Sequence, residues 1–521
     1  MPRLPSLHPL RQHAAPVTTA LVGCGVFLLW MPPTTDLANT RFRVQIFGEV
    51  GISPWNNQWF AGHHTPGYSL IAPPLGWVFG VVLAGVLGVL VASLLFSVLA
   101  HRLVVEHPSL RSPGVASVLF ALGCLASLFG GRIGFAIATA FGVGALLAAV
   151  SDRWLLTGLL ALFTAATNPV AGVFLALLGC ALALSHAVPR RVSIALVVPP
   201  LALLAAEAWL FPDGGDFPFP LGGVVNVLLI TAAVAYIGWR YSTVRWACLG
   251  YAALTILSAL GTTPMGGNTA RFAALAALPV VALTLRRPQW WLVVVAIPLL
   301  VFQWSPVSLA LSGDRAQTET SFYAPLMEVL ATQPQPIRVE VVPLATHDEA
   351  YVVASQYPIA RGWNRQLDRR YNPLFSGDQL TAESYRAWLV ENGISYVAIA
   401  DAELDQGGEL EAALLADPPP YLRLVHADDR WRVFEVLPRP AMAEGATVTE
   451  IGVDTFTLDF AEPGEAVVKV HFSPWFQVVE GAACVADNGD GWSRVVATEA
   501  GTVTVEAVLS WRSIIDRDGD C

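Results

Sequence analysis

Residues 34 to 75 gather several side chains that could carry acid–base or anion-binding chemistry, within a first 310 residues that otherwise hold little charge. A carboxylate can accept a proton from a hydroxyl group, and arginine can hold a phosphate through paired hydrogen bonds. The candidate catalytic residues are Asp36 and Glu49, and the candidate substrate-binding residues of this segment are Arg41, Arg43, His63, His64 and Tyr68.

The charged residues of this segment also have structural interpretations. Asp36 is a good residue type to cap a helix that begins at Leu37, and it could instead form a salt bridge. Arg41 and Arg43 could pair with Asp36 or Glu49 in a cluster that has no catalytic function. The sequence by itself leaves both interpretations open.

The aromatic and histidine residues of the segment are similarly ambiguous. Trp55, Trp59 and Tyr68 are typical either of anchors at a membrane interface or of a surface on which sugars stack. His63 and His64 are adjacent, so their side chains diverge unless the backbone turns, and no third ligand has the spacing of a metal site. We therefore expect no cofactor, with a divalent cation as the weaker alternative.

The composition indicates a polytopic membrane protein. Of the 521 residues, 54% are hydrophobic and 13% are charged, and the mean hydropathy is +0.54. These values lie outside the usual range of soluble domains. The net charge of −10 comes mostly from residues after Gly313, and the sequence shows no basic footprint of a nucleic-acid-binding protein. No nucleic-acid partner is expected.

About eleven apolar segments are candidates for membrane-spanning helices. No small-residue cleavage site follows Trp30, so the first segment is expected to remain as an uncleaved helix. Several segments are short for a bilayer, and one or two could be broken or re-entrant. The segments are 16–31, 75–99, 114–129, 133–150, 154–167, 169–187, 192–211, 221–238, 245–261, 271–285 and 289–304.

Arginines are concentrated in every second loop, and this distribution predicts the membrane topology of the chain. Cytoplasmic loops of membrane proteins are enriched in Lys and Arg, so the arginine-bearing loops and the N-terminus are assigned to the cytoplasm. An odd number of spans then places everything after Ser305 outside the cytoplasmic membrane. The arginines of this set are Arg3, Arg11, Arg102, Arg111, Arg153, Arg190, Arg191, Arg240, Arg245, Arg286 and Arg287.

The opposite loops, expected on the outer face, hold the remaining candidate binding residues. Their arginines break the charge bias and need another reason to be there. Arginine at the mouth of a helix hairpin can reach a lipid phosphate without crossing hydrocarbon. Asp213 and Asp216 lie in a Gly- and Pro-rich turn, where ordinary turn chemistry is the alternative. The candidates are Arg132, Asn168, Asp213, Asp216, Asn268 and Arg271.

Three regions are expected along the chain. Residues 1–311 form a transmembrane domain with a long outer loop over 32–74, residues 312–440 an extracytoplasmic α/β domain, and residues 441–521 a β-rich domain. Mixed helix and strand patterns predict the second region, and short alternating strands predict a small β-sandwich in the third. A polar and aromatic cluster at 360–372 is either a lid or acceptor-binding loop for the membrane site or a surface loop.

The six cysteines divide between these regions. Four lie in apolar segments, where cysteine behaves as a small hydrophobic residue. The other two, Cys484 and Cys521, lie in the compartment expected to be oxidising, so a disulfide between them is expected. An unpaired Cys521 in a frayed terminus is the alternative.

The outer loop ends in the pattern P-W-x-x-x-W-x-x-G-x-x-x-P-G-Y-x-x-x-x-P-P-L, over residues 54–75. With an acidic residue earlier in the loop, many spans and an external C-terminal region, this pattern resembles the GT-C superfamily of integral membrane glycosyltransferases. The chain also resembles multispanning conserved membrane proteins of actinobacteria, of the 6-pyruvoyl-tetrahydropterin-synthase-related membrane domain type. Segments that carry this second likeness are GGRIGFAIA (130–138), NPVAGVFLAL (168–177), FPDGGDFPF (211–219), PMGGNTARF (264–272) and RGWNRQLDRRYN (361–372).

The resemblance implies an activity and its partners. GT-C enzymes typically take a sugar from a polyprenyl-phosphate donor, and an acidic residue of the first outer loop acts as base; here that residue is Asp36. Many members carry paired acids, whereas Asp36 stands alone and Glu49 is thirteen residues away. The implied acceptor is a glycan, lipid or protein of the cell envelope, at the outer face of the cytoplasmic membrane. Arg132 and Arg271 are assigned to the lipid phosphate by their chemistry.

Two other functions compete with this interpretation. A lipid or glycan transporter predicts two related halves and polar residues at mid-membrane, and the sequence shows neither. A non-catalytic envelope-assembly protein would keep the fold without the chemistry, and the single acid of the first loop supports it. The sequence favours a GT-C-type transferase with membrane lipids among its partners.

Overall fold

The chain forms two compact units. The computed structural model describes residues 11–261, 263–287, 289–308, 313–377 and 379–515, with Arg517, Gly519 and Cys521. The first unit comprises Met1–Thr40, Tyr68–Glu207 and Asp216–Ser312, and the second comprises Arg41–Gly67, Ala208–Gly215 and Gly313–Cys521. Arg3 of the cytoplasmic arginine set and the expected boundary at 311 and 312 lie outside the described residues. Two segments from the membrane half of the sequence thus belong to the second unit.

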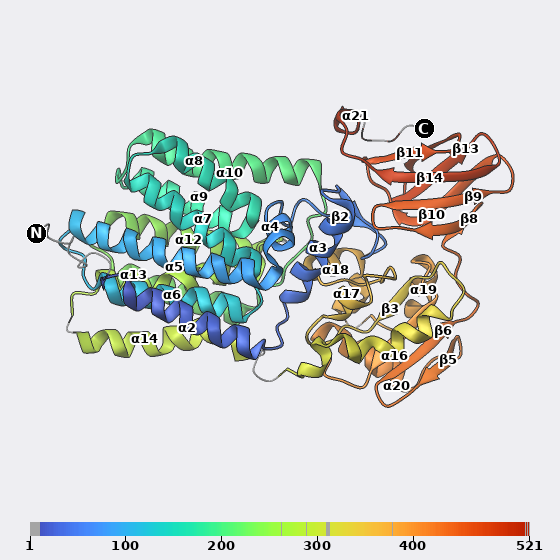
Figure 1. The fold of residues 1–521 in the computed structure, drawn as a ribbon, viewed down its shortest axis with the longest axis horizontal. Helices are drawn as coiled ribbons and strands as arrows, with labels where there is room; N and C mark the ends of the chain where they lie inside the picture. The colour runs from blue at the N-terminus through green and yellow to red at the C-terminus, as the bar shows by residue number, and fades with distance from the viewer. Residues whose placement is uncertain are drawn as a thin grey trace, which may run out of the picture. The chain divides into compact units, whose positions relative to one another are not determined.

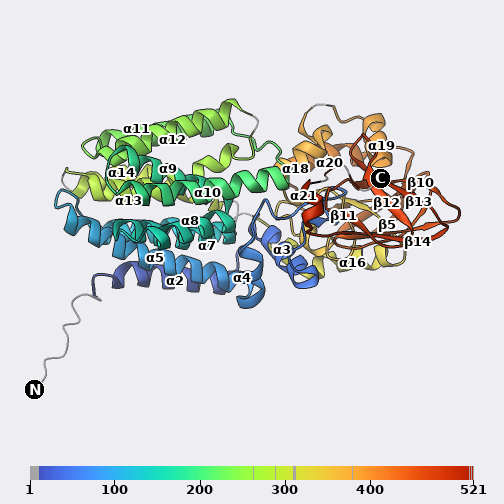
Figure 2. The same ribbon diagram turned by 90° about the horizontal axis from the view of Figure 1, so that it is seen from above.

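The first unit is a bundle of apolar helices that run side by side (Figure 1 and Figure 2). Large apolar side chains such as Leu87, Val91 and Leu94 are exposed on it, as lipid-facing side chains are. Its helices are α2 (Ala14–Trp30), α4 (Ala72–Phe79), α5 (Val81–Glu106), α6 (Pro113–Phe129), α7 (Ile133–Val150), α8 (Trp154–Thr167), α9 (Pro169–Leu184), α10 (Arg190–Leu210), α11 (Leu221–Ile237), α12 (Ser242–Leu260), η1 (Gly266–Thr269), α13 (Ala270–Thr284) and α14 (Gln289–Trp304).

Five helical segments of the described chain are long and apolar enough to cross a membrane, by length and composition. These segments are Val81–Glu106, Ile133–Val150, Arg190–Leu210, Ser242–Leu260 and Gly266–Thr284. The remaining apolar helices, such as α2 and α6, are shorter, at 10–17 residues. The predicted helical membrane part is therefore present, but the eleven predicted spans are not confirmed.

The second predicted segment, 75–99, is interrupted. α4 ends at Phe79 and α5 begins at Val81, with Gly80 between them at a φ of 82°. A backbone with positive φ is accessible to glycine and strained for other residues, so the sequence breaks the helix here. α5 then continues to Glu106, beyond the predicted end.

Close packing of α5 against α7 depends on a glycine. A Cβ atom added at Gly88 would lie 2.9 Å from the Ile137 backbone nitrogen and 3.0 Å from the Ala136 carbonyl oxygen. Small residues at such contacts let helix backbones approach closely in a membrane, where burial of apolar surface does not drive association. The backbones of α5 and α7 are therefore in direct contact at Gly88.

The loops at one end of the bundle are tied together by hydrogen bonds. Arg102, near the end of α5, donates to Ser151, which follows α7, at 2.5 Å. The Arg111 amide, before α6, donates to the carbonyl of Leu283, near the end of α13, at 2.9 Å. These loops belong to the arginine-bearing set, so the fold gathers at one end the loops that the sequence assigned to one side of the membrane.

The described residues of the second unit form three four-stranded sheets, one two-stranded sheet and several short helices. One more helix, α3 (Leu37–Val50), begins in the first unit and continues into the second. The other elements are β1 (Trp55–Asn56), β2 (His63–His64), η2 (Arg315–Thr318), α16 (Thr320–Ala331), β3 (Val339–Val341), α17 (Glu349–Val352), α18 (Arg365–Tyr371), η3 (Pro373–Ser376), α19 (Ala382–Glu391), β4 (Tyr396–Ala400), η4 (Gln406–Gly408), α20 (Glu409–Ala416), β5 (Leu422–Ala427), β6 (Trp431–Val436), β7 (Ala443–Glu444), β8 (Thr447–Ile451), β9 (Thr455–Phe460), β10 (Gly464–His471), β11 (Phe476–Glu480), β12 (Ala483–Asp487), β13 (Trp492–Ala497), β14 (Gly501–Ala507) and α21 (Trp511–Ile515).

The first sheet has the strand order β3-β4-β6-β5 and belongs to the expected α/β region. β3 and β4 are parallel, and the other two pairs are antiparallel. All five residues of β4 are buried, as expected for a central strand covered on both faces. α16, α19 and α20 lie in the same region, as its mixed helix and strand patterns predicted.

The other two sheets, β12-β13-β10-β7 and β11-β14-β9-β8, form the predicted β-sandwich. Alternate residues are buried along β9, β10 and β14, and residues of both sheets join one core cluster that includes Phe456, Val468, Val495 and Val505. This alternation is what the sequence pattern predicted.

Much of the expected outer loop, the segment 41–67, is built into the second unit. The Gln58 carbonyl accepts a hydrogen bond from the Ile359 amide at 2.8 Å, and the Ala61 carbonyl accepts one from the His471 amide at 2.8 Å. Unpaired backbone groups are costly when buried, so these bonds fix the path of the segment. The segment therefore connects the α/β sheet with the sandwich.

Two tryptophans of the segment are core residues. Trp55 and Trp59 are 1% and 0% exposed. Trp55 lies edge-on to Phe476 of the sandwich, at 5.4 Å between ring centroids, and Trp59 stacks on Phe42 at 4.2 Å. The sequence interpretations of these rings as interface anchors or sugar platforms are therefore wrong, because neither ring is accessible.

A disulfide joins Cys484 on β12 to Cys521 and closes a loop with a sequence separation of 37. Gly519 forms a β-bridge with Ala486 beside it. The C-terminal residue is thereby fixed to the edge of the sandwich.

Replacing both Cys484 and Cys521 by serine is expected to destabilise the sandwich by about 2–4 kcal/mol, because the loop no longer restricts the unfolded chain. Thermal unfolding of the full chain in detergent, with and without reductant, measures the effect. The matched control is Cys180→Ser, which removes a free, exposed cysteine. Equal stability of the double variant and the control would contradict a stabilising role.

Candidate functional site

Three charged residues of the first unit meet at one point. One carboxylate oxygen of Asp36 lies 3.2 Å from Nε of Arg132 and 3.7 Å from Nη2 of Arg271. The three side chains are between 19% and 22% exposed. Asp36 thus forms a salt bridge, which was one of the two structural interpretations of this residue. We call these three residues the Asp36 cluster.

Each residue of the Asp36 cluster lies at the N-terminal end of a helix. Asp36 directly precedes α3, Arg132 directly precedes α7, and Arg271 is the second residue of α13. The N-terminal end of a helix carries a partial positive charge, which favours a carboxylate and disfavours an arginine. One carboxylate does not neutralise two guanidinium groups, so the cluster has a formal charge of +1 and is suited to an anion.

A glycine turn brings Arg132 to Asp36. Gly131 has a φ of 75°, and a Cβ atom there would lie 2.5 Å from the Thr34 hydroxyl oxygen and 2.7 Å from the Leu37 backbone nitrogen. The turn before α7 therefore packs directly against the start of α3. Any side chain at Gly131 would push the two charged residues apart.

Two hydroxyl groups near the cluster have no hydrogen-bond partner within the described residues. They belong to Thr34, two residues before Asp36, and to Thr269, two residues before Arg271, and both oxygens are buried. A buried hydroxyl without a partner is unfavourable, and native proteins usually satisfy it. Within the described part of the chain, Thr34 and Thr269 thus have unsatisfied hydroxyl groups close in sequence to Asp36 and Arg271.

Other predicted residues of the first unit lie near the cluster or have structural roles. Tyr68 is half-buried and interacts electrostatically with Arg271. Asn168 caps α9, because its side-chain oxygen accepts a hydrogen bond from the Ala171 amide at 3.1 Å. Asn268 is buried in η1, directly before the helix that carries Arg271, and Asp216 is half-buried in the first unit.

The charged residues of α3 are not part of the Asp36 cluster. Glu49 accepts a hydrogen bond from Gln45 at 2.9 Å and lies at the far end of α3 from Asp36. A helix rises about 1.5 Å per residue, so the backbones of the two residues are about 20 Å apart along the helix axis. Arg41 pairs with Asp348 at 3.4 Å, and Arg43 donates to the Thr65 carbonyl at 3.2 Å. The second predicted catalytic acid is thus separate from the first.

The predicted residues His64 and Asp213 meet in the second unit. Nδ1 of His64 lies 2.8 Å from a carboxylate oxygen of Asp213, whose other oxygen accepts a hydrogen bond from the His64 amide. Burial alone would raise the pKa of the Asp213 carboxyl, but the charge and hydrogen bonds of His64 outweigh it and hold the pKa below its usual value. Asp213 is therefore a buried structural partner, beyond the turn chemistry expected for it.

Sequence reasoning missed the other members of this contact. The Ser473 hydroxyl lies 3.4 Å from Nε2 of His64, and the Tyr371 hydroxyl donates to Asp213 at 3.3 Å. The order Ser473–His64–Asp213 is that of a serine hydrolase triad. Ser473 is fully buried and also accepts a hydrogen bond from the Trp475 amide, so no substrate reaches it. Periodicity carries no signal for such a contact between three distant segments.

His63 is enclosed by aromatic rings. Its ring stacks on Trp59 at 5.7 Å and meets Phe60 edge-on at 5.8 Å. Both ring nitrogens are buried with no hydrogen-bond partner in the described chain. Burial, with the nearby positive charge of Arg43, lowers the pKa of His63 to about 3. The imidazole is therefore neutral at physiological pH.

Arg361, in the polar cluster at 360–372, is buried inside the α/β region. Arg361 is 4% exposed and pairs with Asp368 at 2.7 Å and with Glu411 at 3.3 Å. The Tyr385 hydroxyl donates to the same Glu411 at 2.5 Å. The lid interpretation is not supported for these side chains, because their charges are satisfied inside the domain.

His347 is a second buried histidine, and its pKa is shifted in the opposite direction. His347 lies 3.5 Å from Asp405 and 3.4 Å from Glu349, and Trp363 stacks on its ring at 4.0 Å. Burial by itself would lower the pKa of His347, but the two carboxylates outweigh it and raise the pKa to about 9. This histidine is charged at neutral pH and serves as an internal counter-ion.

Within the described residues, no group of three or more His, Cys, Asp or Glu side chains is arranged to hold a metal ion. The Asp36 cluster offers one carboxylate and two arginines, a set that binds anions. The cluster itself is therefore not built as a cation site.

No protein-family model matches this sequence, and a search of curated proteins finds no significant match. The functional argument therefore depends on the residues and geometry of the chain.

The second unit is expected to lose stability in acid because of His63. The folded pKa of about 3 lies below the usual value of 6.5, so the unfolded chain binds the proton first. The contribution of His63 to the free energy of unfolding is complete above about pH 6.5 and is lost as the pH falls toward 3. Between pH 7 and pH 5 the free energy of unfolding is expected to fall by about 2 kcal/mol.

Urea unfolding of the full chain in detergent at pH 7 and pH 5 measures this loss. His63→Phe keeps an aromatic ring without a titrating group and is expected to reduce the loss of stability. His426→Gln, which removes a half-buried histidine beside Asp428, serves as the control. An unchanged pH dependence in His63→Phe would contradict the assignment.

Proposed function

We propose that this chain is a membrane-embedded glycosyltransferase of the GT-C kind. It transfers a sugar from a polyprenyl-phosphate donor to a cell-envelope acceptor at the outer face of the cytoplasmic membrane. The observation that carries the proposal is the Asp36 cluster, a carboxylate held between two arginines at the N-terminal ends of three helices. The resemblance of the first loop to that superfamily supports the same assignment.

In the proposed reaction, the carboxylate of the cluster acts as a base and the arginines stabilise the leaving phosphate. Asp36 accepts the proton of the acceptor hydroxyl while that oxygen forms a bond to the anomeric carbon of the sugar. The bond from this carbon to the phosphate oxygen breaks, and polyprenyl phosphate leaves with the bonding electron pair. Arg132 and Arg271 stabilise the negative charge that develops on the phosphate.

The cluster fits an anionic headgroup better than a neutral sugar alone. Its excess positive charge and the helix ends around it attract a phosphate, and the hydroxyls of Thr34 and Thr269 can donate hydrogen bonds to its oxygens. A phosphate that draws the arginines away from Asp36 also leaves the carboxylate available as a base. The same substrate would thus bind the site and activate it.

The arginine pattern supports an outer location for the cluster. Arg132 and Arg271 lie on loops opposite to the arginine-bearing set, which the positive-inside rule assigns to the cytoplasm. In this arrangement the N-terminus is cytoplasmic, the chain crosses the membrane about eleven times, and the second unit is extracytoplasmic. Helices of fewer than 18 residues, such as α8 and α9, cross a locally thin bilayer or only part of it.

Asp36→Asn is expected to abolish transfer while the protein still accumulates in the membrane. Loss of a general base lowers a rate about 10²–10⁴-fold, and asparagine keeps the size of the side chain. Envelope glycans are compared in a deletion strain complemented with the wild-type chain or with Asp36→Asn. Full restoration of the glycans by Asp36→Asn would exclude the base assignment.

Glu49→Gln is the matched control, because it removes a carboxylate of the same segment that lies outside the Asp36 cluster. It is expected to restore the glycans. Arg132→Lys and Arg271→Lys keep the charge but lose bidentate hydrogen bonding, so each is expected to raise the donor concentration needed for transfer.

The alternative with support in the structure is a non-catalytic envelope-assembly protein. The salt bridges of Asp36 to both arginines are the favouring observation, because a structural ion cluster needs no substrate. Under this alternative, Asp36→Asn lowers the amount of folded protein, and the glycan defect follows protein level. Under the transferase proposal, the defect occurs at normal protein level.

A further inference from the structure

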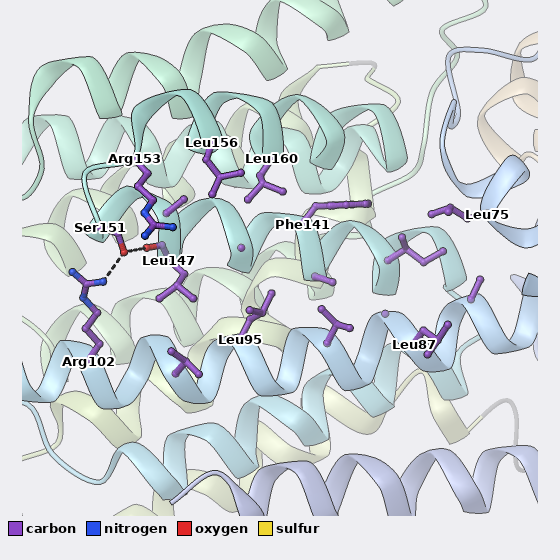
Figure 3. Close-up of a pocket in the computed structure, with 18 of the residues that line it drawn as sticks. Leu75, Leu87, Leu95, Arg102, Phe141, Leu147, Ser151, Arg153, Leu156 and Leu160 are labelled. Carbon is purple, nitrogen blue, oxygen red and sulfur yellow. Dashed lines mark hydrogen bonds between the residues drawn. The ribbon is translucent and has the colours of Figure 1, made fainter. Parts of the chain in front are cut away.

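An apolar groove runs along the first unit between α5, α7 and α8, with a volume of about 680 Å³. This volume lies within the usual range of ligand pockets. Leu87 and Leu95 from α5, Phe141 from α7 and Leu160 from α8 line it (Figure 3). Apolar side chains line the groove over most of its length.

Polar side chains line only one end of the groove. They are Arg102, Ser151 and Arg153, where α5 ends and the turn between α7 and α8 begins. Figure 3 shows the two guanidinium groups approaching Ser151 from opposite sides of the groove. α7 separates this end from Arg132 by 18 residues, or about 27 Å of helix, so the groove end is distinct from the Asp36 cluster.

The two arginines at this end differ in their partners. Arg102 uses three N–H groups, on Glu106, the Val150 carbonyl and Ser151, so two of the five that a guanidinium carries remain. Arg153 is exposed, and its guanidinium makes no hydrogen bond or ion pair within the described part of the chain. Donors therefore remain available at the mouth of the groove.

The local charges leave Arg153 uncompensated. Glu106 is paired with Arg102, and Asp152 is paired with Arg191. These two carboxylates neutralise two arginines, and the charge of Arg153 remains. A positive group at the mouth of an apolar groove between helices is complementary to a lipid with an anionic headgroup.

We propose that this groove binds an anionic glycerophospholipid. One acyl chain lies along Leu95, Phe141 and Leu160, and the phosphate lies between Arg153 and Arg102. The lipid belongs to the leaflet opposite to the Asp36 cluster. It fills the space that α5, α7 and α8 leave open and holds their ends together, so it acts as a structural lipid and does not depend on the proposed transfer reaction.

Native mass spectrometry of the full chain in a non-ionic detergent tests the headgroup contact. Phosphatidylglycerol and phosphatidylcholine with identical acyl chains are added separately. The wild-type chain is expected to bind one phosphatidylglycerol more tightly than phosphatidylcholine. Arg153→Gln is expected to weaken phosphatidylglycerol binding about tenfold or more, because it removes hydrogen bonds to a charged group.

Arg190→Gln is the matched control. Arg190 is exposed at the same end of the bundle and does not line the groove, so its loss removes the same charge without the proposed contact. The control is expected to keep the preference for phosphatidylglycerol. Equal losses in Arg153→Gln and Arg190→Gln would show a general effect of surface charge and overturn the proposal.

A second variant tests the acyl-chain contact. A Cβ atom at Gly144 would lie 3.4 Å from Cδ1 of Leu160 and 3.7 Å from Cδ1 of Leu95, so Gly144→Leu places a side chain in the groove. It is expected to lose one bound phosphatidylglycerol and to melt like the wild-type chain in lipid-free detergent. Unchanged binding, or exchange of the phospholipid for added polyprenyl phosphate in the wild-type chain, would overturn the assignment.

Asp36→Asn separates this proposal from the proposed function. The variant is expected to bind phosphatidylglycerol as the wild-type chain does, because the two sites lie at opposite ends of α7. Loss of the phospholipid in Asp36→Asn would contradict the independence of the two sites and overturn the proposal.

Discussion

The hydrogen bonds of the segment 41–67 are the constraint on which the second unit depends. This segment gives its backbone groups to both the α/β sheet and the sandwich, and it buries Trp55 and Trp59 in their cores. A buried strand-like segment must find partners for its N–H and C=O groups, so its path is fixed once these bonds form. The residues that the sequence singled out there, from Arg41 to His64, are therefore mostly part of the scaffold.

This arrangement concentrates the candidate chemistry in the first unit. Asp36 precedes the segment 41–67 and forms salt bridges with Arg132 and Arg271, at the start of α7 and α13. Arginine at a helix N-terminus is electrostatically unfavourable, and two of them share a single carboxylate. An anionic substrate relieves this imbalance, whereas a purely structural cluster leaves it in place. The phosphate of a lipid-linked sugar, the donor that we propose, is such an anion.

The bundle offers two positively charged places at opposite ends of α7. One is the Asp36 cluster, where a carboxylate accompanies the arginines, and the other is the mouth of the groove at Arg102 and Arg153. A base beside a phosphate site suits proton transfer. Arginines above an apolar groove, with their nearest carboxylates already paired, suit retention of a lipid. The two proposals therefore rest on different chemistry within one bundle.

The sequence by itself determined the helical membrane part, the α/β region and the sandwich, because hydrophobic periodicity and strand alternation are local properties of the chain. The sequence also singled out Asp36, Arg132 and Arg271, because charged residues in the loops expected on the outer face can be recognised without coordinates. Only the tertiary structure decided that these three meet and that Glu49 does not join them. The contact of Ser473 with His64 and the burial of Trp59 likewise depend on pairings between distant segments. Local patterns carry no information on such pairings, because these are selected by packing and by satisfaction of buried polar groups.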